Sequence, residues 1–230
     1  MPKLGADHEN LDTKIYHELK SMILERKLRA GEKIFQDKLA HDLGVSRTPL
    51  VNALKYLERE KLVKALPRRG YVVRQFTEEE MISIFELREV LEGLAARRAA
   101  ANISDAQVTR LEGFFKKFKQ LKDLNDYKRY ENEDRRFHNF VAQLGSKEFL
   151  KTILEAYNII AFSYQVDVYE GLVRPPHETI TEHLAIIRAI TKRNPDKAEE
   201  LMRSHLRKSL NQLKKDFEEK QKSTLAAVHS

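Results

Sequence analysis

Cysteine is absent from this sequence of 230 residues, so disulfide bonds and thiolate chemistry are excluded. No apolar run approaches the roughly 20 residues that a membrane-spanning helix needs. The first ten residues, MPKLGADHEN, carry charges and contain no apolar segment, which argues against a signal peptide. The sequence also shows no nucleophile motif and no glycine-rich phosphate-binding loop. These absences favour a soluble cytoplasmic protein that makes no membrane contact.

Positive charge is in excess, and it lies at one end of the chain. Residues 1–76 contain 16 Lys and Arg against 10 Asp and Glu, a net charge of +6, whereas the remainder contains 26 against 25, a net charge of +1. Hydrophobic residues make up 41%, enough for packed cores, and the length favours two domains. A basic N-terminal domain indicates a polyanionic partner for that end.

Residues 36–59 have the pattern of a helix-turn-helix. A short amphipathic helix ends at Gly44, and Ser46 is then a candidate N-cap for a second helix that begins with Arg47 and Thr48. The start of this second helix would offer a guanidinium, hydroxyls and backbone N–H groups to phosphates and to base edges in a major groove. The alternative is an ordinary helical hairpin within a core.

The residues on either side of this motif complete a winged helix-turn-helix over residues 1–76. The helical period predicts a helix over residues 11–25, and two strands are predicted at 62–66 and 71–74. The turn between the strands could reach a minor groove or phosphates with its basic residues, or it could be a solvated turn. The candidate DNA-contacting residues of this turn are Arg68, Arg69 and Gly70. Gly70 is expected to permit the backbone conformation of the turn.

The N-terminal domain resembles the GntR family of bacterial transcription regulators over about residues 11–76. The resemblance is carried by Leu39-Ala40, Leu43 to Pro49, Ala53-Leu54, Leu57-Glu58, Leu62-Val63 and Pro67 to Tyr71. It implies binding of double-stranded operator DNA by a homodimer, with Arg47 in the place of the family's base-contacting arginine. The sequence departs from the family at Val51-Asn52, where Arg-Glu is common. Asn52 could read an adenine edge or be solvated, and the family's usual operator sequence does not transfer.

From Thr77 onward the pattern is helical, and the fold class predicted for the whole chain is mainly α. An antiparallel bundle of about six helices is expected over residues 77–222, followed by a frayed tail at 223–230. The first helix has a possible break near Gly93. The predicted helices cover about residues 78–101, 105–121, 126–144, 147–170, 177–192 and 195–220.

Four ionisable residues lie on or beside the apolar faces of the predicted helices. Asp134 and His138 are four residues apart on the third helix, His183 lies among the apolar residues of the fifth, and His205 among those of the sixth. Three imidazoles and one carboxylate from three helices would form a site for a divalent transition metal, with zinc favoured and nickel, iron or manganese also suited. The alternative is a set of hydrogen-bonded core residues.

The helical domain resembles the FCD ligand-binding domain of FadR-type GntR regulators over about residues 80–215. The resemblance implies that Asp134, His138, His183 and His205 are metal ligands, as in the metal-binding members. It also implies a small carboxylate effector at the metal, with Arg88 on its carboxylate; an internal salt bridge to Glu92 is the alternative for Arg88. The resemblance rests on Leu87-Arg88, Leu91-Glu92, Asp134, Phe137-His138, Glu182-His183, Ile186-Ile187, Ala189-Ile190 and His205-Leu206.

Some further residues are weaker candidates. His177 follows two prolines at a helix start and is expected to be exposed. Four residues of the fourth predicted helix could line a pocket, although its aromatic residues are more often core. These four are Tyr157, Ser163, Tyr164 and Gln165.

The sequence therefore predicts a transcription regulator whose operator affinity changes when an organic acid binds at a metal. A metal-dependent hydrolase with a basic substrate-binding domain is the alternative, because three histidines and an aspartate could activate water. Against this hydrolase alternative, no clear general base stands beside the candidate metal ligands. A third hypothesis is an architectural DNA-binding protein whose metal is only structural.

Overall fold

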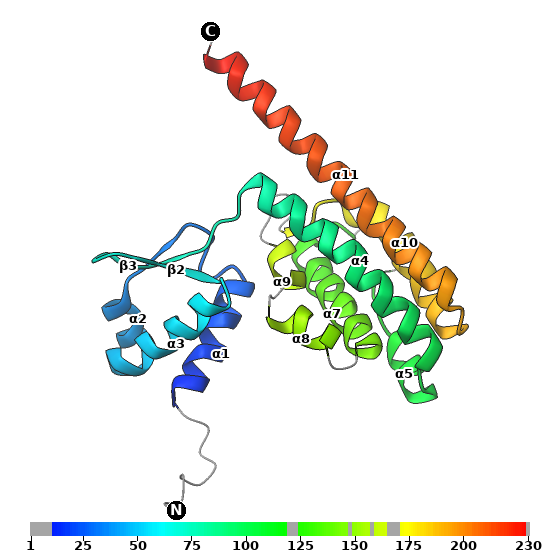
Figure 1. Cartoon of the computed structure of the whole chain (residues 1–230), viewed down its shortest axis with the longest axis horizontal. Coiled ribbons are helices and arrows are strands. Elements are labelled where there is room, and N and C mark those ends of the chain that lie inside the picture. The colour runs from blue at the N-terminus through cyan, green and yellow to red at the C-terminus, as the bar shows by residue number, and fades with distance from the viewer. Residues whose placement is uncertain (1–10, 119–123, 147–148, 157–158, 165–170, 229–230) are drawn as a thin grey trace, which may run out of the picture. The chain divides into compact units, whose positions relative to one another are not determined.

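The computed structural model describes residues 11–118, 124–146, 149–156, 159–164 and 171–228 (Figure 1). The chain divides into two compact units, Met1–Gln75 and Phe76–Ser230, next to the predicted boundary between residues 76 and 77. Among the described residues, no helix is long and apolar enough to cross a membrane. Each unit has its own buried core, and the mainly helical fold class predicted from the sequence is confirmed.

The N-terminal unit is built on helices α1 (Leu11–Leu24), α2 (Gln36–Asp42) and α3 (Arg47–Arg59). The apolar stripe predicted for α3 is buried in the core of this unit. Gly44, between α2 and α3, has φ +64°, a left-handed conformation that costs glycine little. Ser46 is the N-cap residue of α3, as its position predicts, but its side chain accepts no capping hydrogen bond from the described backbone.

A three-stranded antiparallel sheet completes this unit. Strand β2 (Val63–Leu66) pairs with β3 (Gly70–Val73) as the predicted hairpin, and Leu66 lies opposite Gly70 next to the turn. The sequence pattern does not predict β1 (Lys33–Ile34), which pairs with the other edge of β3. Two residues are too few to show the alternation of a strand, and the partner strand is distant in sequence. The unit is a winged helix-turn-helix.

In the C-terminal unit, α4 (Glu78–Asn102) packs against both α11 (Pro195–Val228) and α7 (Tyr127–Gly145), while α10 (Pro176–Thr191) lies beside α11 (Figure 1). The capping box predicted at Thr77 and Glu80 is present. The possible break of α4 near Gly93 is not observed. A Cβ atom at Gly93 would lie 2.6 Å from Cγ of Arg203, so this glycine allows α11 to approach α4 closely.

Three helix boundaries differ from the prediction. Helix α5 (Asp105–Leu111) ends well before the predicted Leu121, and turns follow it, in which Phe115 has φ +60°. The predicted helix over 147–170 divides into α8 (Phe149–Ala156) and α9 (Ile159–Ser163), and part of that range lies outside the described residues. Helix α11 continues through the predicted tail at 223, because no glycine or proline follows Pro195.

Candidate functional site

The four candidate metal ligands come together inside the C-terminal unit. Asp134 and His138 project from α7, His183 from α10 and His205 from α11, and all four side chains are buried. Nε2 of His183 lies 3.0 Å from Oδ1 of Asp134 and 3.2 Å from Nε2 of His205. Nε2 of His138 lies 3.9 Å from Oδ2 of Asp134. The three imidazoles can each offer one nitrogen within 4.8 Å of the others, a spacing that could hold a metal ion.

Hydrogen bonds on the outer side of the histidines orient their rings. Nδ1 of His138 lies 2.5 Å from Oε2 of Glu92, and Nδ1 of His205 lies 2.7 Å from Oε2 of Glu182. A carboxylate can only accept, so both Nδ1 atoms donate. The Nε2 lone pairs of these two histidines therefore face Asp134 and the centre of the cluster. This is the arrangement in which outer carboxylates fix metal-binding histidines.

The third histidine is held by a hydroxyl group. Nδ1 of His183 lies 3.0 Å from the hydroxyl of Tyr130, which in turn lies 2.9 Å from Oγ1 of Thr179. Burial raises the pKa of Tyr130, so this hydroxyl stays protonated. It can accept from Nδ1 of His183 while it donates to Thr179, which leaves Nε2 of His183 as the lone-pair atom.

Burial also sets the charge of the site. It lowers the pKa of His183 well below the ordinary histidine value, and His205 lowers that pKa further. Burial likewise lowers the pKa of His205, although its hydrogen bond to Glu182 opposes this. Both rings are therefore neutral at neutral pH, which is the metal-binding form. Burial alone would raise the pKa of Glu92, but Arg88 and then His138 outweigh it and lower the pKa to about 2.

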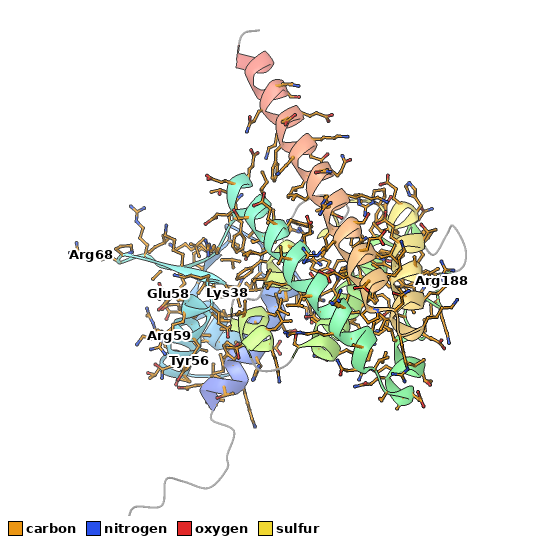
Figure 2. All side chains as sticks on the ribbon, turned by 45° about the vertical axis from the view of Figure 1, so that its right-hand side comes forward. Lys38, Tyr56, Glu58, Arg59, Arg68 and Arg188 are labelled. Carbon is orange, nitrogen blue, oxygen red and sulfur yellow. The ribbon has the colours of Figure 1, made fainter. Side chains whose placement is uncertain are left out.

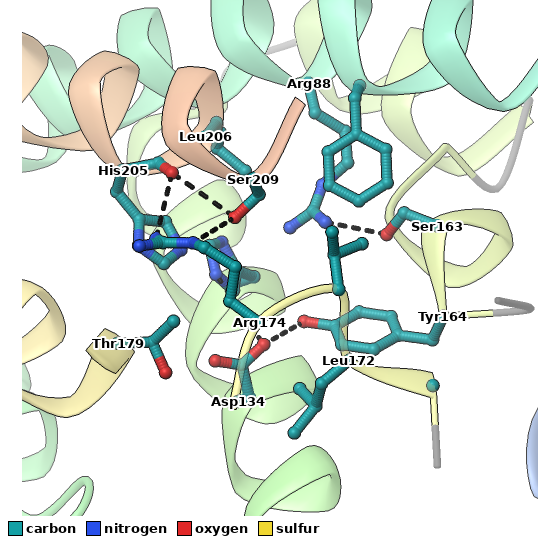
Figure 3. Close-up of a pocket in the computed structure, with 14 residues that line it drawn as sticks. Arg88, Asp134, Ser163, Tyr164, Leu172, Arg174, Thr179, His205, Leu206 and Ser209 are labelled. Carbon is teal, nitrogen blue, oxygen red and sulfur yellow. Dashed lines mark hydrogen bonds and ion pairs between the residues drawn. The ribbon is translucent and has the colours of Figure 1, made fainter. Parts of the chain in front are cut away.

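A pocket lies beside the cluster, with Asp134, His138 and His205 in its wall (Figure 3). It contains about 350 Å³ of space outside the protein atoms, part of it open to solvent. Arg88 on α4 also lines this pocket, and its side chain is buried. The hydroxyl of Tyr164 lies across the pocket from Arg88 and donates to Oδ2 of Asp134 at 2.6 Å (Figure 3). A small polar molecule in this pocket would lie against both Arg88 and the histidine cluster.

Arg88 forms the internal salt bridge considered for it and keeps one nitrogen without a partner among the described residues. Its Nε donates to Oε1 of Glu92 at 2.6 Å, the internal salt bridge, and its Nη1 donates to Oγ of Ser163 at 2.7 Å. Its Nη2 has no hydrogen-bond partner among the described residues. Buried donors are nearly always paired, because an unpaired one has lost its water without compensation. This N–H group therefore suits an anion in the pocket.

The sequence pattern does not identify the roles of Arg174, which lines the pocket, and of Glu182, its ion-pair partner behind the pocket wall. Arg174 donates to the two oxygens of Glu182 at 3.2 and 2.6 Å, and this carboxylate holds His205. The only sequence signal is that Glu182 precedes His183. Ser163 and Tyr164 line the pocket, whereas Tyr157 and Gln165 lie outside the described side chains. His177 is exposed, as expected.

The candidate DNA-contacting residues lie on the surface of the N-terminal unit. Ser46, Arg47 and Thr48 are exposed at the start of α3. Nη1 of Arg47 lies 3.1 Å from Oδ1 of Asp37, and exposed ion pairs of this kind contribute little stability. Arg68 lies at the tip of the β2–β3 hairpin (Figure 2), with Arg69 exposed beside it and Gly70 at φ +86°.

The structure gives Asn52 an intramolecular partner. Its Nδ2 donates to Oδ2 of Asp12 on α1 at 3.0 Å, and the side chain is partly buried. Of the two roles left open for Asn52, this contact favours neither a solvated side chain nor a base-reading one, because it turns the amide group toward α1.

Comparison with known proteins agrees with these features. The family model described as "Bacterial regulatory proteins, gntR family" matches residues 11–73, and the model described as "FCD domain" matches residues 83–208. Together these matches cover the winged unit and the bundle that contains the histidine cluster.

Individual proteins that are similar to this chain include transcriptional regulators. The chain is 29% identical over 212 residues to an uncharacterized HTH-type transcriptional regulator, YdhC, of Bacillus subtilis, covering 89% of this chain and 91% of that protein. It is 26% identical to the HTH-type transcriptional repressor RspR of Escherichia coli, covering 85% and 86%. The solved structure of E. coli McbR/YncC has the same fold, with a TM-score of 0.73, 18% identity and coverage of 90% and 99%.

Proposed function

Since this chain belongs to the gntR family of bacterial regulatory proteins and carries an FCD domain, we propose that a small organic acid bound at a metal controls its affinity for operator DNA. The chain is a DNA-binding transcription regulator and not an enzyme, as are the families and relatives that it matches. The hydrolase alternative is therefore not retained. A regulator that binds operator DNA would act in the cytoplasm.

The observation that carries the proposal is the buried histidine cluster next to Arg88, whose Nη2 has no partner among the described residues. His138, His183 and His205, with Asp134, would hold a divalent ion, and their donor set suits zinc first and nickel, iron or manganese as well. A bound ion would supply positive charge and open coordination positions for a carboxylate. Arg88 would donate to the same carboxylate through Nη2, which has no partner among the described residues.

The acid can act as an effector only if it binds one arrangement of the protein more tightly than another. Residues of α4, α7, α10 and α11 all line the pocket, so a ligand there contacts four helices of the bundle at once. Such a ligand can favour one packing of these helices. Because α4 begins directly after the winged unit, a shift of α4 is the simplest route by which the ligand would alter DNA binding.

We further propose that the regulator is a homodimer whose α4 helices pair. One face of α4 carries the apolar residues Leu87, Val90, Leu91 and Leu94, and the side chains of Leu87 and Val90 are 49% and 50% exposed. Antiparallel pairing would bring the acidic start of one α4 near Arg98 of the second copy. Two recognition helices would then reach successive major grooves about one helical turn apart.

Replacing Leu87 with aspartate is expected to weaken dimerisation by at least about 100-fold, because a symmetric interface would bury two unpaired carboxylates. Sedimentation velocity across a concentration series measures the dissociation constant of the dimer. The matched control is Leu184→Asp on α10. Leu184 is 40% exposed, and its substitution should leave the dimer intact. A Leu87→Asp protein that stays dimeric would refute the α4 interface.

The test of the proposed function begins with chelator-treated protein and its melting temperature in zinc, nickel or manganese, each with and without a panel of small carboxylates. Metal at about 100 times its dissociation constant should raise Tm by roughly 5–10 °C, and one acid should raise it further. The same acid should then change affinity for a duplex selected from a random library. A metal response with no acid effect on DNA affinity would instead indicate a structural metal.

A further inference from the structure

Glu92 is a buried carboxylate whose two oxygens serve two different residues. Oε1 accepts from Nε of Arg88 at 2.6 Å, and Oε2 accepts from Nδ1 of His138 at 2.5 Å. Its side chain is 1% exposed, and Arg88 and His138 are equally enclosed. We propose that Glu92 is a shared positioning residue, which holds a metal-binding histidine and the acid-binding arginine at the same time. The proposal rests on the proposed function of the pocket.

Each contact fixes one orientation. The bond to Nδ1 keeps the proton of His138 on its outer nitrogen, so that Nε2 presents a lone pair toward Asp134. The bond to Nε fixes the guanidinium of Arg88, whose Nη1 is held by Ser163 and whose Nη2 is left without a partner among the described residues. One carboxylate thus prepares both halves of the pocket before any ligand binds.

The same carboxylate also joins the two halves electrostatically. An ion on Nε2 of His138 would draw electron density from the ring and make Nδ1–H a stronger donor to Glu92. The negative charge of Glu92 would then compensate less of the charge on Arg88, which would attract an anion more strongly. Metal and acid should therefore each raise the affinity of the other, since coupling between two sites is reciprocal.

An amide at position 92 cannot serve both residues. Glutamine has one acceptor oxygen and one NH₂ donor. If its nitrogen faces Nε of Arg88, two donors meet and the guanidinium is displaced. If its nitrogen faces His138, the ring must accept at Nδ1 and carry its proton on Nε2, the atom that would bind the metal. Glu92→Gln should therefore damage both functions while it preserves side-chain volume.

Glu182→Gln is the matched control. Glu182 holds His205 through Nδ1 as Glu92 holds His138, but its other contacts go to Arg174 and Lys208 and not to Arg88. Both variants lose an outer hydrogen bond of a candidate ligand, so both should bind zinc about 10- to 100-fold more weakly. Glu92→Gln should lose the greater part of its affinity for a carboxylate, because Glu92 holds Arg88, whose Nη2 has no partner among the described residues.

The experiment uses the full chain with zinc and with acetate as the carboxylate probe, at ionic strength held constant with chloride. Zinc affinity is measured by competition with an indicator, and acetate affinity by calorimetry at saturating zinc. The expected result is that Glu92→Gln binds acetate at least about tenfold more weakly than Glu182→Gln does. Retention of Tm in chelator by both variants shows that the fold survives.

The outcomes separate the two proposals. Equal acetate affinities in Glu92→Gln and Glu182→Gln, or unchanged zinc affinity in Glu92→Gln, would overturn the shared role of Glu92 and leave the regulator intact. If the wild-type chain binds zinc but no acetate, the carboxylate pocket itself is wrong, and the role of Glu92 falls with it.

Discussion

Replacing His183 with alanine is expected to reduce zinc affinity by at least about 100-fold and to remove the metal-dependent rise in Tm. The substitution deletes an Nε2 atom that lies 3.0 Å from Oδ1 of Asp134 and 3.2 Å from Nε2 of His205. Loss of an outer hydrogen bond around a metal already costs about 10- to 100-fold, so the loss of a ligand atom costs more. Zinc affinity is measured by competition with an indicator after chelator treatment.

The loss of zinc affinity in His183→Ala must be separated from the loss of core packing. His183 is fully buried, and its ring stacks on Phe115 with centroids 4.7 Å apart, so the alanine variant also loses core contacts. The melting temperature in the presence of a chelator measures the loss of core contacts alone. His177→Ala is the control, because His177 lies on the same helix and is exposed; it should leave zinc affinity unchanged. A His183→Ala protein with a lower Tm in chelator but wild-type zinc affinity would make His183 a core residue only.

The convergence of the metal candidates could be anticipated from the sequence because each one interrupts an apolar stripe. Charged and imidazole side chains seldom face a core without a partner, and the period of 3.6 residues places His183 beside Ile187 and His205 beside Met202. All four of these side chains are buried. Helical periodicity thus carries much of the information about which residues face inward, and the capping boxes at Thr77 and Ser104 mark where two of the helices begin.

The outer contacts of the site could not be anticipated, because they depend on how the helices pack. Glu92 meets His138 across the contact between α4 and α7, and Glu182 meets His205 across the contact between α10 and α11. A sequence period defines the face of one helix but not the rotation and displacement of its neighbour. For the same reason β1 escapes prediction, since its pairing with β3 depends on a distant segment.

Replacing Arg47 with alanine is expected to remove most of the affinity for the operator, which is the largest effect we expect on DNA affinity. Loss of an arginine that contacts a base costs about 1–3 kcal/mol. A homodimer would lose two such contacts, so specific affinity should fall by about 30-fold to 10⁴-fold. Arg47 is exposed at the start of α3, away from the buried stripe of that helix, so the fold should survive. Affinity for a selected duplex and for a scrambled duplex is measured at one salt concentration.

Arg59→Ala provides the control for charge. Arg59 is exposed at the other end of α3, where it lies over the ring of Tyr56, and its loss changes net charge by the same amount. If Arg47 contributes only charge, both variants should weaken selected and scrambled duplexes alike. If it reads a base, Arg47→Ala should remove the preference for the selected duplex, whereas Arg59→Ala should keep it. Retention of the preference by Arg47→Ala would contradict base reading at this position.

The ion pair with Asp37 does not argue against this role. Asp37 and Arg47 are 82% and 62% exposed at their side chains, so water and salt screen their attraction, which is worth at most about 1 kcal/mol. A contact with a base is worth as much or more and can replace it. Asn52 differs, because its partly buried amide already donates to Asp12. Arg47 is therefore the α3 residue at which substitution should most change the sequence that this regulator recognises.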